Sequence, residues 1–303
     1  MVHLLVERRS KGHTFVAQDR LTKKVFTVRR VFLDVANAGK DDGLPTSLLR
    51  EVSLMKCLTH SNIAQLINVQ VEGSRAQLQY EHLDFNLKDY IRRRMITMKP
   101  ENPFLKTSIN SKPFYTLPLP EIKNALWQIL QGLHFCHQRG IMHRNLKPDN
   151  ILVHMTPQGP QVKLSDFAFC RQFSLAYSVY TPEDPKERER SGREARRLWY
   201  RPPELLLRKR EYFIEVDMWA VGCILAELAI AQPLFPGESE IEQLKQIFTF
   251  TGTPDRDTFE VYFSGQSGPR VEFPNWRRVS FVNLCSPKGS QEAAEVVEAY
   301  YSR

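Results

Sequence analysis

The stretch EVDMWAVGCILAELAIAQ, residues 215–232, limits the possible fold more than any other part of the chain. It reads as a helix, and apolar side chains lie on nearly every face of that helix. A helix that is apolar all round has to be surrounded by other elements, because none of its faces is suited to water. The sequence therefore predicts a large lobe with a buried central helix.

A second helix belongs to the same lobe. Residues 121–140 carry apolar side chains on one helical face, and Gly140 can end the helix. The members of this face are Ile122, Leu126, Ile129, Leu130 and Leu133. Residues 97–120 before it are rich in Pro, Ser, Thr and Asn, which predicts a loop or an insertion. Residues 290–303 read as a final helix.

The first third of the chain has a different pattern, with short runs that are typical of β-strands. Five such runs predict strands, at 4–9, 13–19, 24–33, 62–73 and 75–83. In the third run, side chains alternate between the two faces of the strand. Val25, Thr27 and Arg29 therefore share one face, and Phe26 and Val28 share the other.

One helix interrupts these strands. Residues 45–58 carry Leu48, Leu49, Val52 and Met55 at helical spacing. We therefore predict an α+β domain with two lobes over residues 1–303: a small β-rich lobe with one helix at 1–82, a hinge at 83–86, and a larger, mainly helical lobe at 87–303. A ligand cleft is expected between two such lobes.

Composition excludes several classes of protein. The chain is 42% hydrophobic and 25% charged, which is ordinary for a globular protein and argues against disorder. No run of about 18 apolar residues is present, so we expect no membrane-spanning helix, and residues 1–12 do not resemble a signal peptide. The cysteines lie far apart, which argues against zinc and disulfides and for the reducing cytoplasm or nucleus. They are Cys57, Cys136, Cys170, Cys223 and Cys285.

The net charge is +8, and the densest basic stretch is residues 186–210. One interpretation is an anionic partner, such as nucleic acid or an acidic protein. The alternative is a solvated loop in which glutamates separate the basic residues. We favour the loop and expect neither a nucleic-acid nor a membrane partner, because no nucleic-acid-binding motif accompanies the charge.

Several motifs follow one another in a specific order. They are HRNLKPDN (143–150), KLSDFA (163–168), WYRPPELLL (199–207) and DMW (217–219). Their order and spacing resemble a protein kinase domain. Further stretches resemble the cyclin-dependent kinases of the CMGC group in particular: PTSLLRE (45–51), PLFPGESEIEQL (233–244) and TGTPD (251–255). The resemblance covers about residues 4–276. It implies a bilobal kinase fold, ATP and Mg²⁺ as cofactors, and phosphate transfer to a protein serine or threonine.

The resemblance assigns roles to four retained residues. Glu51 stands at the acidic position of the small-lobe helix, and Lys147 can neutralise a transferring phosphate. Asp166 and Asn150 can offer oxygen ligands to Mg²⁺, although both could instead only bond the loop backbone. The resemblance also implies a set of nucleotide-binding positions. They are Gly12, Arg29, Glu51, Tyr80, Glu81, Leu83 and Leu152.

Other parts depart from the kinase pattern on the nucleotide side. The glycine-rich loop falls on residues 7–12, where only Gly12 remains to let the backbone approach phosphate, and Glu7 adds like-charge repulsion. Arg29 replaces the phosphate-binding lysine, and its planar fork is larger, although it could still pair with Glu51. Thr27 and Tyr80 would crowd the adenine pocket.

Two departures affect the acceptor side. Asn145 replaces the catalytic aspartate; it can orient a hydroxyl but cannot accept its proton at neutral pH. Such general-base assistance typically contributes about 10²–10⁴-fold in rate. Ala168 replaces a glycine, which would be costly if a positive φ were needed there.

The resemblance also implies a phosphate site and a partner surface. Arg50, Arg144 and Arg171 match three arginines that gather around a phosphothreonine, but the threonine position holds Gly192. Candidate substitutes are Thr181, Glu183, Glu187 and Ser191. Equally, the arginines could pair with local acids. Leu48 and Leu49 could enter a cyclin-type groove, or pack under the small sheet.

The family's large lobe continues with further helices, so we expect a shortened large lobe in which Glu204 lacks its usual arginine. From these features we favour a cyclin-dependent-kinase-like pseudokinase that binds a cyclin or another partner. The alternative is an active serine/threonine kinase with a protein substrate. A weaker alternative is a phosphate-dependent binding module that uses the arginine cluster.

Overall fold

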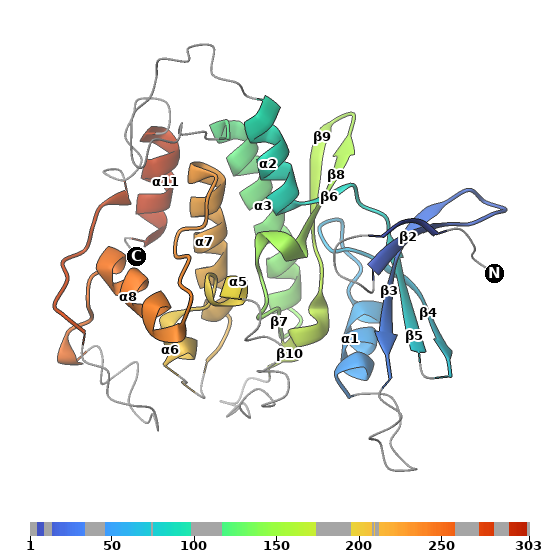
Figure 1. The fold of residues 1–303 in the computed structure, drawn as a ribbon, viewed down its shortest axis with the longest axis horizontal. Coiled ribbons are helices and arrows are strands. Elements are labelled where there is room, and N and C mark those ends of the chain that lie inside the picture. Colours follow the sequence, from blue (N-terminus) through green and yellow to red (C-terminus); the bar gives the residue numbers. More distant parts are fainter. Residues whose placement is uncertain are drawn as a thin grey trace.

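The chain folds into a small, β-rich lobe and a larger, mainly helical lobe that lie side by side (Figure 1). The structure is a computed structural model that describes residues 5–8, 14–33, 46–73, 75–97, 117–173, 195–207, 209, 212–257, 273–281 and 291–301. This α+β, two-lobed architecture is the one that the sequence predicts. The proposed residue limits of the lobes stay a prediction.

The small lobe is an antiparallel sheet with one helix packed beside it. Its strands are β1 (Leu5–Arg8), β2 (Thr14–Gln18), β3 (Val25–Phe32), β4 (Leu66–Glu72) and β5 (Arg75–Glu81), in the spatial order β1-β2-β3-β5-β4. The helix is α1 (Thr46–Cys57). All five predicted strands and this helix are confirmed, with ends that differ from the predicted ones by a few residues.

Strand β3 separates two environments, as its alternation predicts. Phe26 and Val28 are buried in a small cluster with Ala17 of β2. Arg29 is on the other face, where it meets α1 and the large lobe. This face of β3 therefore supplies side chains to the space between the lobes.

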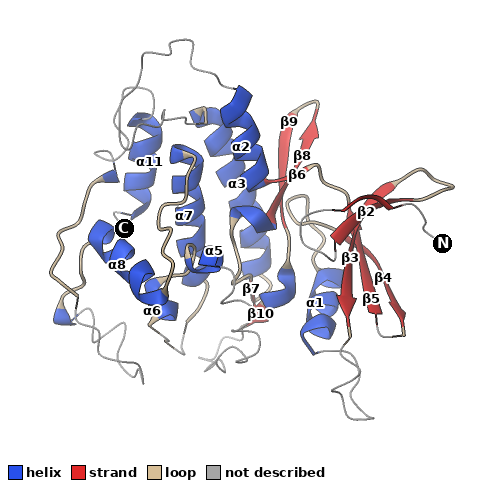
Figure 2. Cartoon of the chain, viewed as in Figure 1, coloured by secondary structure: helices blue, strands red, loops and turns tan. Residues whose placement is uncertain are grey.

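The large lobe is built mainly from helices, which Figure 2 shows beside the two small groups of strands at its edge. Its longer helices are α2 (Leu87–Thr97), α3 (Leu119–His137), α7 (Glu215–Ile230), α8 (Glu240–Thr251) and α11 (Gln291–Tyr301). Its short elements are β6 (Phe85–Asn86), β7 (Ile141–Met142), β8 (Ile151–Thr156), β9 (Gly159–Leu164), β10 (Arg171–Gln172), α5 (Ala195–Leu198), α6 (Pro203–Leu206), and 3₁₀ turns at Pro148–Asn150 and Phe167–Phe169.

Helix α7 is the buried central helix that residues 215–232 predict. Twelve of its residues are buried, including Asp217 and Glu227. It packs between α3 and α11. The fit against α11 is close, because a Cβ atom added at Gly222 would lie 2.5 Å from Cε1 of Tyr300. The Tyr300 hydroxyl also donates a hydrogen bond to the Met218 carbonyl.

Helix α3 confirms part of its predicted face and corrects the rest. Ile122, Ile129 and Leu133 are buried, but Leu126 and Leu130 are only half-buried. Gln128 is buried in their stead, because it bonds a strand of the same lobe. Gly140 follows the helix with φ of +69°, the left-handed conformation that favours glycine.

Two sequence predictions fall largely or wholly outside the described residues. They are the loop at 97–120, of which only the ends at Thr97 and 117–120 are described, and the glycine-rich loop with Gly12. Among the helices that the structure describes, none is both long and apolar enough to cross a membrane.

Candidate functional site

Arg29 lies at the centre of the space between the lobes. One terminal nitrogen of its guanidinium, Nη2, pairs with Oε2 of Glu51 on α1. The other, Nη1, lies 3.3 Å from Oδ1 of Asp166, which follows β9 in the large lobe. Arg29 thus occupies the lysine position of the kinase pattern and makes the pair with Glu51 that the sequence suggests. It also reaches the acid that the resemblance assigns to Mg²⁺.

Glu51 is almost fully enclosed, with 3% of its side chain exposed. Its second oxygen, Oε1, accepts a hydrogen bond of 3.0 Å from the Tyr80 hydroxyl. Burial raises the pKa of both Glu51 and Tyr80, so the tyrosine keeps its proton and remains a donor. Burial, the largest single influence, lowers the pKa of Arg29, but Glu51, Tyr80 and Asp166 together outweigh it and the pKa is raised.

Asp166 uses both of its carboxylate oxygens inside the protein. Oδ1 faces Arg29, and Oδ2 accepts a hydrogen bond of 3.1 Å from Nδ2 of Asn145. The backbone of Asp166 has φ of +63°, a left-handed conformation. Ala168 lies in the 3₁₀ turn that follows and is not among the described non-glycine residues with positive φ. The cost expected from losing a glycine there therefore does not arise.

Asn150 stabilises the loop that carries Asn145. Its side-chain Nδ2 donates to the backbone carbonyl of Asn145 at 2.8 Å. Its backbone carbonyl accepts from the backbone N–H and the hydroxyl of Ser165. Asn150 and Lys147 are both buried, and the backbone N–H of Asn150 donates to the backbone carbonyl of Lys147. The contacts of Asn150 therefore fit the structural role that the sequence left open, namely bonding the loop backbone.

The Asp217 side chain on α7 holds the loop that carries Asn145, a role that the sequence did not predict. Its carboxylate accepts from the backbone N–H groups of His143 and Arg144, at 2.8 and 2.7 Å. It also lies 2.9 Å from Nε2 of His137. The only signal in the sequence was the DMW motif, which pointed to the family but not to this contact.

His143 is fully buried beside the same loop. Its Nδ1 accepts from the backbone N–H of Asn145 at 3.3 Å, so the ring proton is on Nε2, 3.0 Å from the Ser165 carbonyl. Burial lowers the pKa of His143, and the ring stays neutral. The histidine therefore positions Asn145 and carries no charge into the cleft.

A further contact crosses the region where the resemblance places adenine. Oγ1 of Thr27 on β3 lies 3.2 Å from Nδ1 of His82, which follows β5. Thr27 also lies opposite Tyr80 in the sheet register. Of the other assigned positions, Leu83 is buried and Leu152 is half-buried. His82 was not predicted, because its residue type gives no hint of a partner fifty-five positions earlier.

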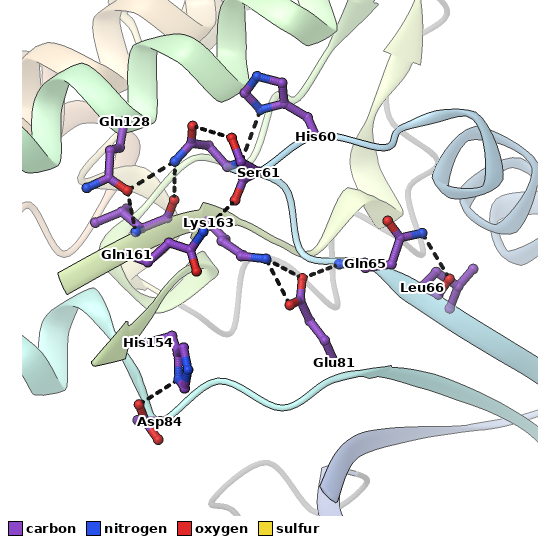
Figure 3. Close-up of polar contacts among 12 residues, drawn as sticks. His60, Ser61, Gln65, Leu66, Glu81, Asp84, Gln128, His154, Gln161 and Lys163 are labelled. Atoms are coloured by element: carbon purple, nitrogen blue, oxygen red, sulfur yellow. Dashed lines mark hydrogen bonds and ion pairs between the residues drawn. The ribbon is translucent and has the colours of Figure 1, made fainter. Parts of the chain in front are cut away.

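The Glu81 side chain joins the lobes, as Figure 3 shows. Both of its oxygens lie 2.8 Å from Nζ of Lys163 on β9, and Oε1 accepts from the Gln65 backbone. Any contact of Glu81 with a nucleotide would therefore be made by its backbone. Nearby, Nδ2 of Asn62 donates to Oε1 of Gln128 at 3.1 Å and to the Val162 carbonyl at 2.8 Å.

Two of the three predicted phosphate-cluster arginines, Arg50 and Arg144, act on the short segment that precedes the third, Arg171. Arg171 is in β10, which pairs with β7 immediately before Arg144. Burial raises the pKa of the Cys170 thiol to about 12, while the charges of Arg50 and Arg144 act in the opposite direction. Arg144 also donates to the Phe169 carbonyl at 3.2 Å. The candidate substitutes for the threonine, at 181–192, lie outside the described residues.

The two leucines of the predicted partner surface have different surroundings. Leu48 is 5% exposed and belongs to the core, whereas Leu49 is 50% exposed. Glu204 is half-buried, and burial raises its pKa to about 7. A backbone hydrogen bond and, to a lesser degree, the charge of Lys209 act in the opposite direction.

Comparison with protein families supports what the two lobes and this site indicate. The model of the protein kinase domain family matches residues 10–299. The chain therefore belongs to the protein kinase family, whose domains generally bind ATP and Mg²⁺.

The arrangement around Asp166 does not fit Mg²⁺ as it stands. A magnesium ion requires near-octahedral oxygen ligands at about 2.0–2.1 Å. Here both Asp166 oxygens face donors, and one of those donors is a guanidinium that would repel a metal ion. A metal ion at Asp166 would lie beside the Arg29 guanidinium, whose positive charge opposes its binding.

Proposed function

We propose that this protein is a cyclin-dependent-kinase-like pseudokinase that acts by binding a cyclin or another protein partner. The observation that carries the proposal is the engagement of both Asp166 oxygens by Arg29 and Asn145. The Arg29 guanidinium pairs with the Asp166 carboxylate. In the kinase pattern this carboxylate binds a metal ion, which in turn binds the phosphates of ATP.

The acceptor side supports the same proposal. The Asn145 amide donates to Asp166, and an amide cannot take a proton from a substrate hydroxyl at neutral pH. Loss of general-base assistance costs about 10²–10⁴-fold in rate. Together with the crowded nucleotide side, this leaves little transition-state stabilisation for phosphate transfer.

A cyclin-like partner is proposed from the small-lobe helix. Leu49 exposes half of its side chain on α1, within the PTSLLRE stretch that resembles the cyclin-dependent kinases. An apolar side chain exposed on a helix suits insertion into a hydrophobic groove. Leu48 is in the core and contributes only to the position of the helix.

One observation favours the alternative of an active serine/threonine kinase. Arg29 and Glu51 form an ion pair at the two positions where the resemblance places the phosphate-binding lysine and its glutamate. A nucleotide that displaced Arg29 from Asp166 could then find the remaining parts in place. The experiment below separates this alternative from the pseudokinase.

The test is a thermal-shift titration of the purified chain with ATP, with Mg²⁺ and with EDTA. We expect no Mg²⁺-dependent stabilisation at millimolar ATP. The matched variant Arg29→Lys/Asn145→Asp restores the kinase residues and should gain such a shift if the rest of the cleft is usable. ATP at a hundred times its dissociation constant would stabilise the protein by about 2.7 kcal/mol. Such a stabilisation of the wild type, abolished by Asp166→Ala, would contradict the proposal.

A further inference from the structure

Helix α1 buries a charged side chain on the face that packs into the core. Leu48, Glu51 and Met55 lie on this face, and each is at most 5% exposed. Leu49 comes two positions before Glu51, and two positions turn an α-helix by about 200°, because one turn takes 3.6 residues. Leu49, which is half exposed, therefore points away from Glu51. The rotation of α1 about its own axis thus decides which side chain faces a partner.

The sheet of the small lobe holds Glu51 through two neighbouring strands. Arg29 on β3 pairs with Oε2, and the Tyr80 hydroxyl on β5 donates to Oε1 at 3.0 Å. Tyr80 lies opposite Thr27 in the register, and Thr27 shares a strand face with Arg29, so both donors come from one face of the sheet. Both carboxylate oxygens therefore have a donor at a place where an unpaired acceptor would be costly.

The two donors make different contributions. Arg29 is shared between Glu51 and Asp166, whereas the Tyr80 hydroxyl bonds only Glu51 in its described contacts. The Tyr80 ring packs against the hydrophobic core, so its hydroxyl has a fixed place. A long arginine side chain has the rotamer freedom to follow a moving carboxylate, but a packed ring has not. Rotation of α1 would therefore separate Oε1 from the Tyr80 hydroxyl and leave a buried acceptor unpaired.

We propose that Tyr80 is a positioning residue that fixes the rotation of α1, so that Leu49 faces outward before any partner binds. The hydrogen bond to Glu51 makes the rotated state of the helix rare. A partner then meets a surface that is already formed, and no affinity is lost to a rearrangement of the helix. The docking role of this surface rests on the proposed function, whereas the hold of Tyr80 on α1 is independent of it.

The test is hydrogen–deuterium exchange of the full chain, without nucleotide or partner, in the wild type and in Tyr80→Phe. Phenylalanine keeps the packed ring and removes only the hydroxyl. We expect amide exchange in α1 to become at least fivefold faster, because the helix opens more often once a hydrogen bond to a charged group is lost. Exchange in α7 of the large lobe should stay unchanged. Thermal melting shows that each variant is folded.

The matched control is Tyr90→Phe in the large lobe. The Tyr90 hydroxyl donates to Oε2 of Glu121 at 3.0 Å, and Arg94 pairs with the same carboxylate, so this site also combines a tyrosine, an arginine and a glutamate. Tyr90→Phe should leave exchange in α1 unchanged. Unchanged exchange of α1 in Tyr80→Phe, or an equal increase in both variants, would overturn the proposal.

A nitroxide spin label at Leu49→Cys gives a second readout, which a general loss of stability would not change. Cys57 is exposed, so Cys57→Ser and Cys285→Ser are included to direct the label to position 49. We expect one spectral component with Tyr80 and a second component with Tyr80→Phe, from the rotated helix. Identical spectra would overturn the positioning role. An ATP-dependent shift in the earlier titration would contradict the pseudokinase proposal and leave this result unaffected.

Discussion

Arg29, Glu51 and Asp166 come from three different elements and meet as two carboxylates around one guanidinium. Without a cation between them, the carboxylates would repel one another at close range. A lysine has a compact point charge, whereas the planar fork of Arg29 can serve both acids at once. Arg29 thus pairs with both acids, and Asn145 donates to the second oxygen of Asp166.

At the residue scale, Glu227 gives a prediction for pH. It is buried in α7, accepts a hydrogen bond from the Tyr200 hydroxyl, and burial raises its pKa to about 7. Because the pKa of Glu227 is higher in the folded state than in the unfolded chain, the folded protein binds the carboxyl proton more tightly. Its stabilising contribution is therefore complete below the ordinary value of 4.5 and is lost as pH rises through 7.

We therefore expect Glu227→Gln to weaken the decline in the free energy of unfolding between about pH 4.5 and 7. The difference between variant and wild type should reach at most about 3 kcal/mol, with the variant more stable at pH 8. Urea denaturation across this pH range measures it. Glu204 titrates in the same window and is unchanged in both proteins, so it cancels. Parallel curves for the two proteins would contradict the prediction.

At the element scale, the contact between α7 and α11 depends on the absence of a side chain. We expect Gly222→Ala to destabilise the protein by about 1–3 kcal/mol, because the new Cβ would overlap the ring of Tyr300. Chemical denaturation measures the loss. The double variant Gly222→Ala/Tyr300→Ala serves as the control, since the overlap is absent from it.

The two losses should be less than additive in that double variant, because residues in contact couple. Additive losses would show that the overlap does not set the cost. Tyr300→Ala alone also removes the hydrogen bond to the Met218 carbonyl, so the single variant has to be measured as well.

At the scale of the whole molecule, the lobes meet along a second line of contacts away from Arg29. The segment after α1 runs beside β9, where the Ala64 amide donates to the Leu164 carbonyl and the Leu164 amide to the Asn62 carbonyl, both at 2.8 Å. The pair of Glu81 and Lys163 lies along the same line (Figure 3). The relative position of the lobes is thus held without a nucleotide.

We expect Asn62→Ala to cost about 1–3 kcal/mol in the free energy of unfolding, because buried acceptors lose their donor. Hydrogen exchange should increase in β9 and in the segment before β4. The matched control is Asn68→Ala, because Asn68 is exposed and bonds only the neighbouring Val69 amide in its described contacts. Equal effects of the two changes would refute the prediction.

Much of the fold could be predicted from local patterns. Short runs typical of β-strands located the sheet of the small lobe, helical spacing located α1 and α3, and an apolar pattern on all faces located α7. The buried face of α3 was predicted less well, since Gln128 is buried whereas Leu126 and Leu130 are only half-buried. The Gln128 side chain is buried because it accepts a hydrogen bond from the Val162 backbone on β9. The pairing of Arg29 with Glu51 was also available, since the resemblance places both residues.

The sequence by itself determined the protein kinase family, the order of the elements and which side chains share a face of β3, because these depend on spacing along the chain. Only the tertiary structure decided that Asp166 is satisfied by Arg29 and Asn145, that Thr27 meets His82, and that the Tyr80 hydroxyl donates to Glu51. These contacts join residues far apart in sequence. Their geometry depends on how the lobes pack, which no local pattern encodes.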